Sequence, residues 1–205
     1  MDEPGLFPNN EGNNHPFGEE FYDSVTFEKI ILPPTELKNI EFYKCTFKYV
    51  TMPSSVIKDC RFEDCSFISC DLTLLKLART MILNTGFTEC KLIGIDWTGT
   101  VKPFKTSYIK CKMNDSAFWE MDLRNTKFNG CEARNVLFSG ANLMHAEFKG
   151  TDLKDSRFQR TNMSFADFSE AISYNINPND NIIKKAKFSY PEVLSLLNDF
   201  EIIVE

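Results

Sequence analysis

The chain lacks most of the residue patterns from which catalytic and metal sites are built. Only two of its 205 residues are histidines, His15 and His145. A glycine-rich phosphate-binding loop, a zinc-protease helix and a serine nucleophile elbow are all missing from the sequence. We therefore expect a protein that is not an enzyme and that binds neither a cofactor nor a metal.

Long hydrophobic runs and a strong positive charge are missing as well. No apolar run approaches the ~20 residues that cross a bilayer. The first twenty residues, MDEPGLFPNNEGNNHPFGEE, are acidic and polar, whereas a secretory signal would be basic and then apolar. The net charge of -6 is opposite to that of a basic nucleic-acid binder. We expect a cytoplasmic protein that contacts neither membranes nor nucleic acid directly.

Phenylalanine is abundant, with 19 copies against six tyrosines and two tryptophans. Apolar residues recur at every fifth position, a period that fits neither the 3.6 residues of a helix turn nor the two of a strand. The first series is Phe27, Leu32, Leu37, Phe42, Phe47, Met52, Ile57, Phe62, Phe67, Leu72, Leu77, Ile82, Phe87, Leu92 and Trp97. After a shift of one residue, the second is Tyr108, Met113, Phe118, Leu123, Phe128, Ala133, Phe138, Leu143, Phe148, Leu153, Phe158, Met163 and Phe168.

The residue two positions before each of these apolar residues is mostly small or β-branched. All seven cysteines occupy this position. The other three positions of each unit carry nearly all of the charge, as in Gly150-Thr151-Asp152-Leu153-Lys154. Each unit is therefore expected to direct one small and one large residue inward and three residues toward water.

Four units show this pattern most clearly: a small residue, then Asp or Asn, then a large apolar residue. They are Ala141-Asn142-Leu143, Thr151-Asp152-Leu153, Thr161-Asn162-Met163 and Ala166-Asp167-Phe168. Over residues 25–170 the sequence resembles the pentapeptide-repeat family. The resemblance implies an all-β fold, a right-handed quadrilateral β-helix with four units in each coil of about twenty residues and about seven coils.

The cysteines at every fifth position of CRFEDCSFISC, Cys60, Cys65 and Cys70, are too far apart for the usual spacing of zinc ligands. A coil of about twenty residues places Cys45 under Cys65, Cys70 under Cys90, and Cys111 under Cys131. Stacked cysteines come close enough for a disulfide, but their parallel side chains oppose the required torsion. We interpret them as reduced thiols that fill the core.

The chain divides into three expected parts. Residues 1–20 form a flexible N-terminal tail, and residues 21–170 form the β-helix with a loop at 98–107. Residues 171–205 form a C-terminal cap and dimerisation segment. In this segment Pro191 suits the first turn of an α-helix, with Ser189 as its cap, and residues 201–205 are expected to form a short strand.

The apolar side chains of this segment allow two interpretations. They can cover the last coil as a lid, or they can join two copies of the chain. The apolar stripe is wider than a lid requires, so we favour a homodimer. The expected dimer interface comprises Val193, Leu194, Leu197, Phe200, Ile202 and Val204.

The break in the repeat at residues 98–107 contains glycine and proline, which indicate a loop that leaves the rod. Such a loop is a natural place for a specific contact, and Pro103, Phe104 and Lys105 are the candidate partner-binding residues. The alternative is a tolerated insertion that only reorients one corner. The sequence does not separate the two.

Within the family, the chain resembles most the quinolone-resistance (Qnr-like) and microcin-immunity branch, through its central loop and the tail motif Asn177-Pro178-Asn179-Asp180-Asn181. That resemblance implies a protein that binds DNA gyrase or topoisomerase IV by DNA mimicry. A DNA mimic should be acidic along the rod, but in this chain the excess of acidic residues lies before residue 42. Residues 1–41 hold nine acids and two bases, net -7, whereas residues 42–205 hold twenty acids and twenty-one bases, net +1. The alternative is a scaffold for another protein, and a continuous acidic stripe would favour the mimic.

Overall fold

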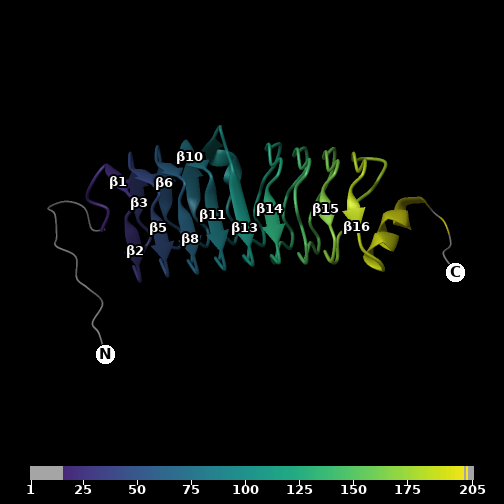
Figure 1. The fold of residues 1–205 in the computed structure, drawn as a ribbon, viewed down its shortest axis with the longest axis horizontal. Helices are drawn as coiled ribbons and strands as arrows, with labels where there is room; N and C mark the ends of the chain where they lie inside the picture. Colours follow the sequence, from purple (N-terminus) through teal and green to yellow (C-terminus); the bar gives the residue numbers. More distant parts are fainter. Residues whose placement is uncertain (1–15, 201, 203–205) are drawn as a thin grey trace, which may run out of the picture.

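The structure, a computed structural model, describes residues 16–200 and 202. They form a parallel β-solenoid of about eight coils that stack along one axis (Figure 1). The strands are β1 (Phe21–Asp23), β2 (Thr26–Glu28), β3 (Glu36–Lys38), β4 (Glu41–Tyr43), β5 (Thr46–Lys48), β6 (Val56–Lys58), β7 (Arg61–Glu63), β8 (Ser66–Ile68), β9 (Lys76–Ala78), β10 (Thr80–Leu83), β11 (Thr85–Thr88), β12 (Thr100–Val101), β13 (Thr106–Ile109), β14 (Lys127–Asn129), β15 (Asp167–Phe168) and β16 (Lys187–Phe188). Two 3-10 helices, η1 (Trp97–Gly99) and η2 (Glu192–Phe200), complete the elements.

The strands pair across coils rather than along the chain. The sheets have the orders β1-β4-β7-β10-β12, β14-β13-β11-β8-β5-β2, β3-β6-β9 and β15-β16. Partners such as Phe27 and Phe47 are twenty residues apart, and isolated bridges such as Thr51 to Asp71 follow the same step. The expected all-β fold with a twenty-residue coil is confirmed.

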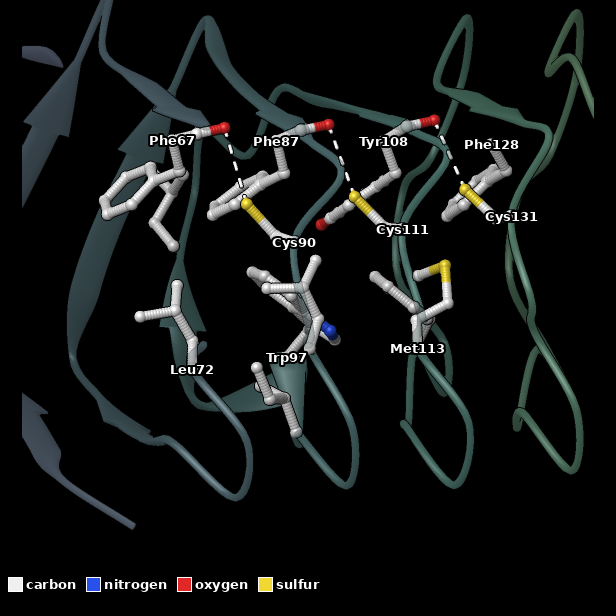
Figure 2. Close-up of a cluster of buried hydrophobic side chains, with 14 of the residues drawn as sticks. Phe67, Leu72, Phe87, Cys90, Trp97, Tyr108, Cys111, Met113, Phe128 and Cys131 are labelled. Carbon is white, nitrogen blue, oxygen red and sulfur yellow. Dashed lines mark hydrogen bonds between the residues drawn. The ribbon is translucent and has the colours of Figure 1, made fainter. Parts of the chain in front are cut away.

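The apolar series fills the inside of the rod. Phe47 and Phe67 stack with ring centroids 4.4 Å apart, and Tyr108 and Phe128 stack at 5.2 Å. These side chains are buried, as are the seven cysteines. Figure 2 shows part of this core, in which stacked rings lie beside a column of thiols. Burial of this apolar surface is the main stabilising contribution to the fold.

The corners of the rod have a backbone conformation that the repeat imposes. The residue two positions after the central apolar residue has positive φ in most units, for example Asp59 at 52° and Asn125 at 61°. Asn, Asp and Gly adopt this left-handed conformation at the lowest cost. The third outward position of each unit is therefore a turn residue as well as a surface residue.

The break in the repeat changes the step between coils from twenty residues to twenty-one. β11 shows both steps. Its Gly86 pairs with Ser66 in the preceding coil, twenty residues earlier, and its Thr85 pairs with Thr106 in the following coil, twenty-one residues later. Within the expected loop at 98–107, η1 and β12 remain part of the coil, and only residues 102–105 lie outside helices and strands. Gly99 is needed there because a Cβ would lie 2.0 Å from the Leu77 carbonyl oxygen.

The N-terminal end of the rod begins earlier than predicted. Residues 1–15 of the expected tail lie outside the described residues, but Phe17 is buried. Its ring contacts those of Phe27, at 5.0 Å between centroids, and Phe42, at 5.6 Å. Phe17 therefore covers the first coil, and it continues the five-residue series backward through Tyr22.

The prediction ended the β-helix at residue 170, but the coil continues beyond that residue. Bridges join Asp152 to Ile172 and Asn162 to Ile182, and β15 pairs with β16. Ala171 and Ile176 are buried and continue the small inward position of the repeat, whereas Ser173 and Pro178 stand where large apolar residues are expected. Tyr174, one residue out of register, also fills the core. This additional coil explains why the structure has about eight coils instead of about seven.

The expected C-terminal α-helix is a 3-10 helix, η2. Leu196 of η2 is buried and Val193 packs against the core, so this segment is docked on the rod. The Ser189 carbonyl accepts a hydrogen bond from the Val193 amide at 3.0 Å, and its hydroxyl accepts one from the Glu170 amide at 3.1 Å, which ties the start of η2 to the last coil. Ile202 lies in no strand, and residues 201 and 203–205 of the expected final strand lie outside the described residues.

Candidate protein-interaction site

A groove of about 410 Å³ opens beside the break in the repeat. One wall comes from the segment after η1 and contributes Val101, Pro103 and Phe104. The other wall comes from the following coil and contributes Trp119 and Met121. The groove therefore joins residues that the extra residue in the coil has brought to one side of the rod.

Packing beneath the groove holds its two walls in place. The Phe104 ring lies edge-on to Trp97, with 6.0 Å between centroids, and Trp97 stacks on Phe118 at 5.6 Å. Trp119 follows the inward Phe118 and therefore points outward, with 49% of its surface exposed. An exposed indole beside a hollow is typical of a binding site, because tryptophan contributes a large contact area.

The three candidate loop residues have different positions. Pro103 and Phe104 line the groove, whereas Lys105 does not. The Lys105 amide donates to the Ile82 carbonyl at 3.1 Å, and its own carbonyl accepts from the Thr85 amide at 3.2 Å. Lys105 thus ties the loop to the sheet. The prediction missed Trp119, although a tryptophan directly after an inward phenylalanine was a usable signal.

Several charged side chains on the rod form ion pairs between neighbouring coils. Examples are Arg79 with Asp59 at 2.7 Å, Lys91 with Asp71 at 3.0 Å, Lys127 with Glu147 at 3.3 Å and Arg134 with Asp152 at 2.7 Å. The Arg79 guanidinium holds the pKa of the Asp59 carboxyl below its usual value. Within the described part of the chain, cations therefore alternate with these carboxylates along the rod.

Two further ion pairs lie within single strands or units near the groove. Arg124 donates to Asp122 through Nε at 2.8 Å and Nη2 at 2.7 Å. These bonds lower the pKa of Asp122, and the positive charge of Lys102 lowers it further. Arg61 makes an equivalent contact to Glu63, with Nε 3.0 Å from Oε2.

The buried cysteines include a column of thiols along the rod, formed by Cys90, Cys111 and Cys131. Over residues 16–200 and 202, no three His, Cys, Asp or Glu side chains lie together as a metal site would require. Each thiol donates to a backbone carbonyl, as Cys90 does to Phe67 at 3.4 Å (Figure 2). Burial raises the pKa of Cys65 to about 12. The twenty-one-residue step also brings Cys111 over Cys90, a contact that the twenty-residue period did not predict.

The residues expected at the dimer interface fall into two groups. Val193 and Leu197 are half-buried against the rod. Leu194 and Phe200 are 40% and 46% exposed, and Ile202 is also exposed. Val204 lies outside the described residues. The segment therefore covers the last coil and also presents apolar surface.

None of the helices in the described part of the chain is both long enough and apolar enough to cross a bilayer. The sides of the rod consist of short strands and turns, whose backbone groups form hydrogen bonds with neighbouring coils. For example, the Thr46 amide donates to the Val25 carbonyl at 2.9 Å.

The chain is similar in fold to solved pentapeptide-repeat structures. It matches QnrB1, a plasmid-mediated fluoroquinolone resistance protein, at 16% identity with a TM-score of 0.53, covering 89% of this chain and 100% of QnrB1. HetL, involved in heterocyst differentiation regulation in the cyanobacterium Nostoc, matches at 15% identity with a TM-score of 0.49, covering 82% of this chain and 87% of HetL. No curated protein matches the sequence.

The sequence repeat has a direct family match. Residues 101–188 match the pentapeptide repeat region, and this range includes the units with the clearest pattern. The same five-residue register continues toward the N-terminus through strands that pair in the same way. The repeat, the coil that it builds and the family match identify residues 101–188 as a pentapeptide-repeat region.

Proposed function

We propose that this protein is a non-enzymatic scaffold that binds another protein through the groove beside residues 98–105. The exposed Trp119 next to this groove is the observation that carries the proposal. In the described coils, stacked side chains fill the core, so we place recognition on the outer surface. Pro103 and Phe104 contribute to the binding surface, and Lys105 holds the loop in position.

We also propose that the scaffold acts as a homodimer through the exposed part of the C-terminal segment. Leu194, Phe200 and Ile202 supply the apolar surface. A cytoplasmic location fits the seven free cysteines, because a reducing compartment keeps thiols unpaired.

The second candidate is binding to DNA gyrase or topoisomerase IV by DNA mimicry. A fold like that of a fluoroquinolone resistance protein favours it. Asp59, Asp71 and Asp152 count against it, because each is already bound to a cation, whereas a mimic presents its carboxylates to a basic DNA-binding surface. The scaffold is therefore the better-supported proposal.

A gyrase supercoiling assay separates the two candidates. Purified protein is titrated with and without a quinolone, beside a Val101→Glu variant. The scaffold proposal expects neither inhibition nor protection at micromolar protein. Protection by the wild-type protein would instead assign it to topoisomerases, and loss of protection in the variant would place that contact at the groove.

A positive test of the scaffold uses affinity capture from the producing cells. Wild-type protein should retain a partner that Val101→Glu does not, and the purified partner should then bind the wild type with a measurable Kd. An Ile31→Glu variant is the matched control, because Ile31 is exposed and bridges Thr51, several coils before the groove. Equal capture by all three proteins would contradict a role for the groove.

A further inference from the structure

Four buried cysteines occupy the same corner of four consecutive coils. In each coil the residue directly after the cysteine forms parallel bridges to the next coil, through Asp71, Lys91, Lys112 and Glu132. We use the name four-thiol column for Cys70, Cys90, Cys111 and Cys131. The twenty-one-residue step at the break in the repeat aligns Cys90 with Cys111. A twenty-residue step would place residue 110, a lysine, over Cys90 and divide the column into two pairs.

The thiols of the column lie parallel and in contact. Figure 2 shows the sulfurs of Cys90, Cys111 and Cys131 in one row along the rod. The Cys70 amide donates to Cys90 Sγ at 3.4 Å, so adjacent coils approach closely at this corner. A hydrogen bond with Cys90 raises the pKa of the Cys70 thiol, and one with Cys111 raises the pKa of Cys90 to about 12. A hydrogen bond with Cys111 lowers the pKa of Cys131.

This row of sulfurs fits a linear metal bridge better than a disulfide or a zinc site. A disulfide needs a torsion of roughly 90° about its S–S bond, which parallel side chains do not provide. Zinc needs four ligands around one point, whereas each gap between two coils has two sulfurs. Adjacent strands lie about 4.7–4.9 Å apart. Two collinear metal–thiolate bonds of ~2.3 Å span ~4.6 Å, so a two-coordinate ion fits at the ordinary spacing of the coils.

We infer that the four-thiol column binds Cu(I), with each ion in line between the sulfurs of two adjacent coils. Cu(I) is a soft ion that takes thiolate ligands. Each Cu(I) replaces one thiol proton: an S–H bond breaks, a Cu–S bond forms to each of the two sulfurs, and the proton is released to solvent. Four thiols enclose three gaps. Three ions then leave three thiolates and one thiol, so that the buried column has no net charge, as an apolar core requires.

The surroundings of the column favour a soft ion over other ligands. The four cysteines are at most 2% exposed, so water and hard ligands are kept out. Each thiol donates to a backbone carbonyl, as Cys111 does to Phe87 at 3.4 Å, but S–H is a weak donor and its replacement by Cu(I) loses little. The Cys70 amide already points at Cys90 Sγ, and a thiolate accepts this bond more strongly than a thiol.

Copper analysis of the wild type and three cysteine variants tests the inference. The whole protein is incubated anaerobically with Cu(I) buffered by bicinchoninate, both folded and during refolding from urea, because buried thiols become accessible only when coils open. The chelator removes copper from exposed side chains. Cys111→Ala interrupts two gaps and should bind two fewer ions than the wild type. Cys131→Ala interrupts one gap and should bind one fewer.

Cys60→Ala is the matched control and should bind as much copper as the wild type. Cys60 is stacked between Ile40 and Thr80, so it has no thiol neighbour in its own column. Cys45 and Cys65 form a further stacked pair that all these variants retain, and only the differences between variants are compared. Alanine fills the same inward position elsewhere, for example at residues 141 and 146, so the variants should fold. Thermal unfolding checks this.

X-ray absorption at the copper edge gives the ligands directly. Loaded wild-type protein should show two sulfur ligands for each copper and no nitrogen or oxygen. An equal loss of one ion in all three variants would mean that each thiol binds copper independently, and this would overturn the inference. Nitrogen or oxygen ligands, or no retained copper after both loading procedures, would overturn it as well. The groove is not involved, so either result leaves the scaffold proposal standing.

Discussion

Phe128 represents the residues on which the stability of the rod depends. It is fully buried, and its ring stacks on Tyr108 at 5.2 Å and on Phe148 at 4.9 Å. Phe128→Ala should lower the free energy of unfolding by roughly 3–5 kcal/mol, because it leaves a cavity between two coils. Urea unfolding measures this loss. Phe21→Ala is the matched control, since Phe21 is 54% exposed. An equal loss in both variants would contradict the inward register.

The buried thiols should make stability depend on alkaline pH. The pKa of Cys65 is about 12 in the folded chain, above the ~8.5 of an exposed thiol. The folded state therefore holds this proton more tightly than the unfolded state. The stabilisation is complete below about pH 8.5 and is lost as pH rises toward 12, by at most about 1.4 kcal/mol per pH unit.

Urea midpoints between pH 8 and 11 measure this dependence. Cys65→Ala should show a shallower decline than the wild type, and Phe21→Ala should keep the wild-type slope. Identical slopes for all three proteins would mean that the Cys65 thiol ionises as readily in the folded chain as in the unfolded one.

Glycine is needed at two places in the rod for different reasons: close packing at Gly99 and backbone conformation at Gly150. At Gly99 a Cβ would meet the Leu77 carbonyl oxygen at 2.0 Å, whereas at Gly150 nothing lies within 4 Å but φ is +64°. Gly99→Ala should cost roughly 1–3 kcal/mol because β9 and η1 must separate. Gly150→Ala should cost about 1 kcal/mol from backbone strain alone. Thermal unfolding of both variants gives the comparison, and a Gly150→Ala cost equal to or above that of Gly99→Ala would be inconsistent with this packing.

The C-terminal segment is the element in which sequence and structure differ most. The sequence pattern places Leu197 and Phe200 on one apolar stripe, but Leu197 is half-buried against the rod and Phe200 is exposed. The prediction assumed a free α-helix. Docking of Leu196 into the last coil rotates the segment and divides the stripe between cap and exposed surface.

At the scale of the whole molecule, the exposed half of this segment should hold two rods together. Leu194→Glu places a charge on an exposed apolar side chain and should convert a dimer to a monomer without unfolding the cap. Sedimentation velocity measures the change. Ile31→Glu, at a residue 79% exposed at the other end, should remain dimeric. A monomeric wild type, or a Leu194→Glu variant that is still a dimer, would rule out this interface.

The sequence predicted the interior of the rod because the five-residue period is a local property. Phe47, Cys65 and Phe128 could each be placed inward by counting from a neighbour. Counting in steps of five failed where the repeat is interrupted or where a residue at the central position is not apolar. The one-residue shift hid the contact of Cys111 with Cys90. Ser173 and Pro178, at positions where the repeat has large apolar residues, hid the last coil.

By itself the sequence determined which side chains face inward and which face water, since that choice depends on neighbours within five residues. Only the tertiary structure decided which outward residues lie side by side, because that depends on where the coil closes. Val101 and Trp119 meet across one groove because the insertion shifts the register between two coils.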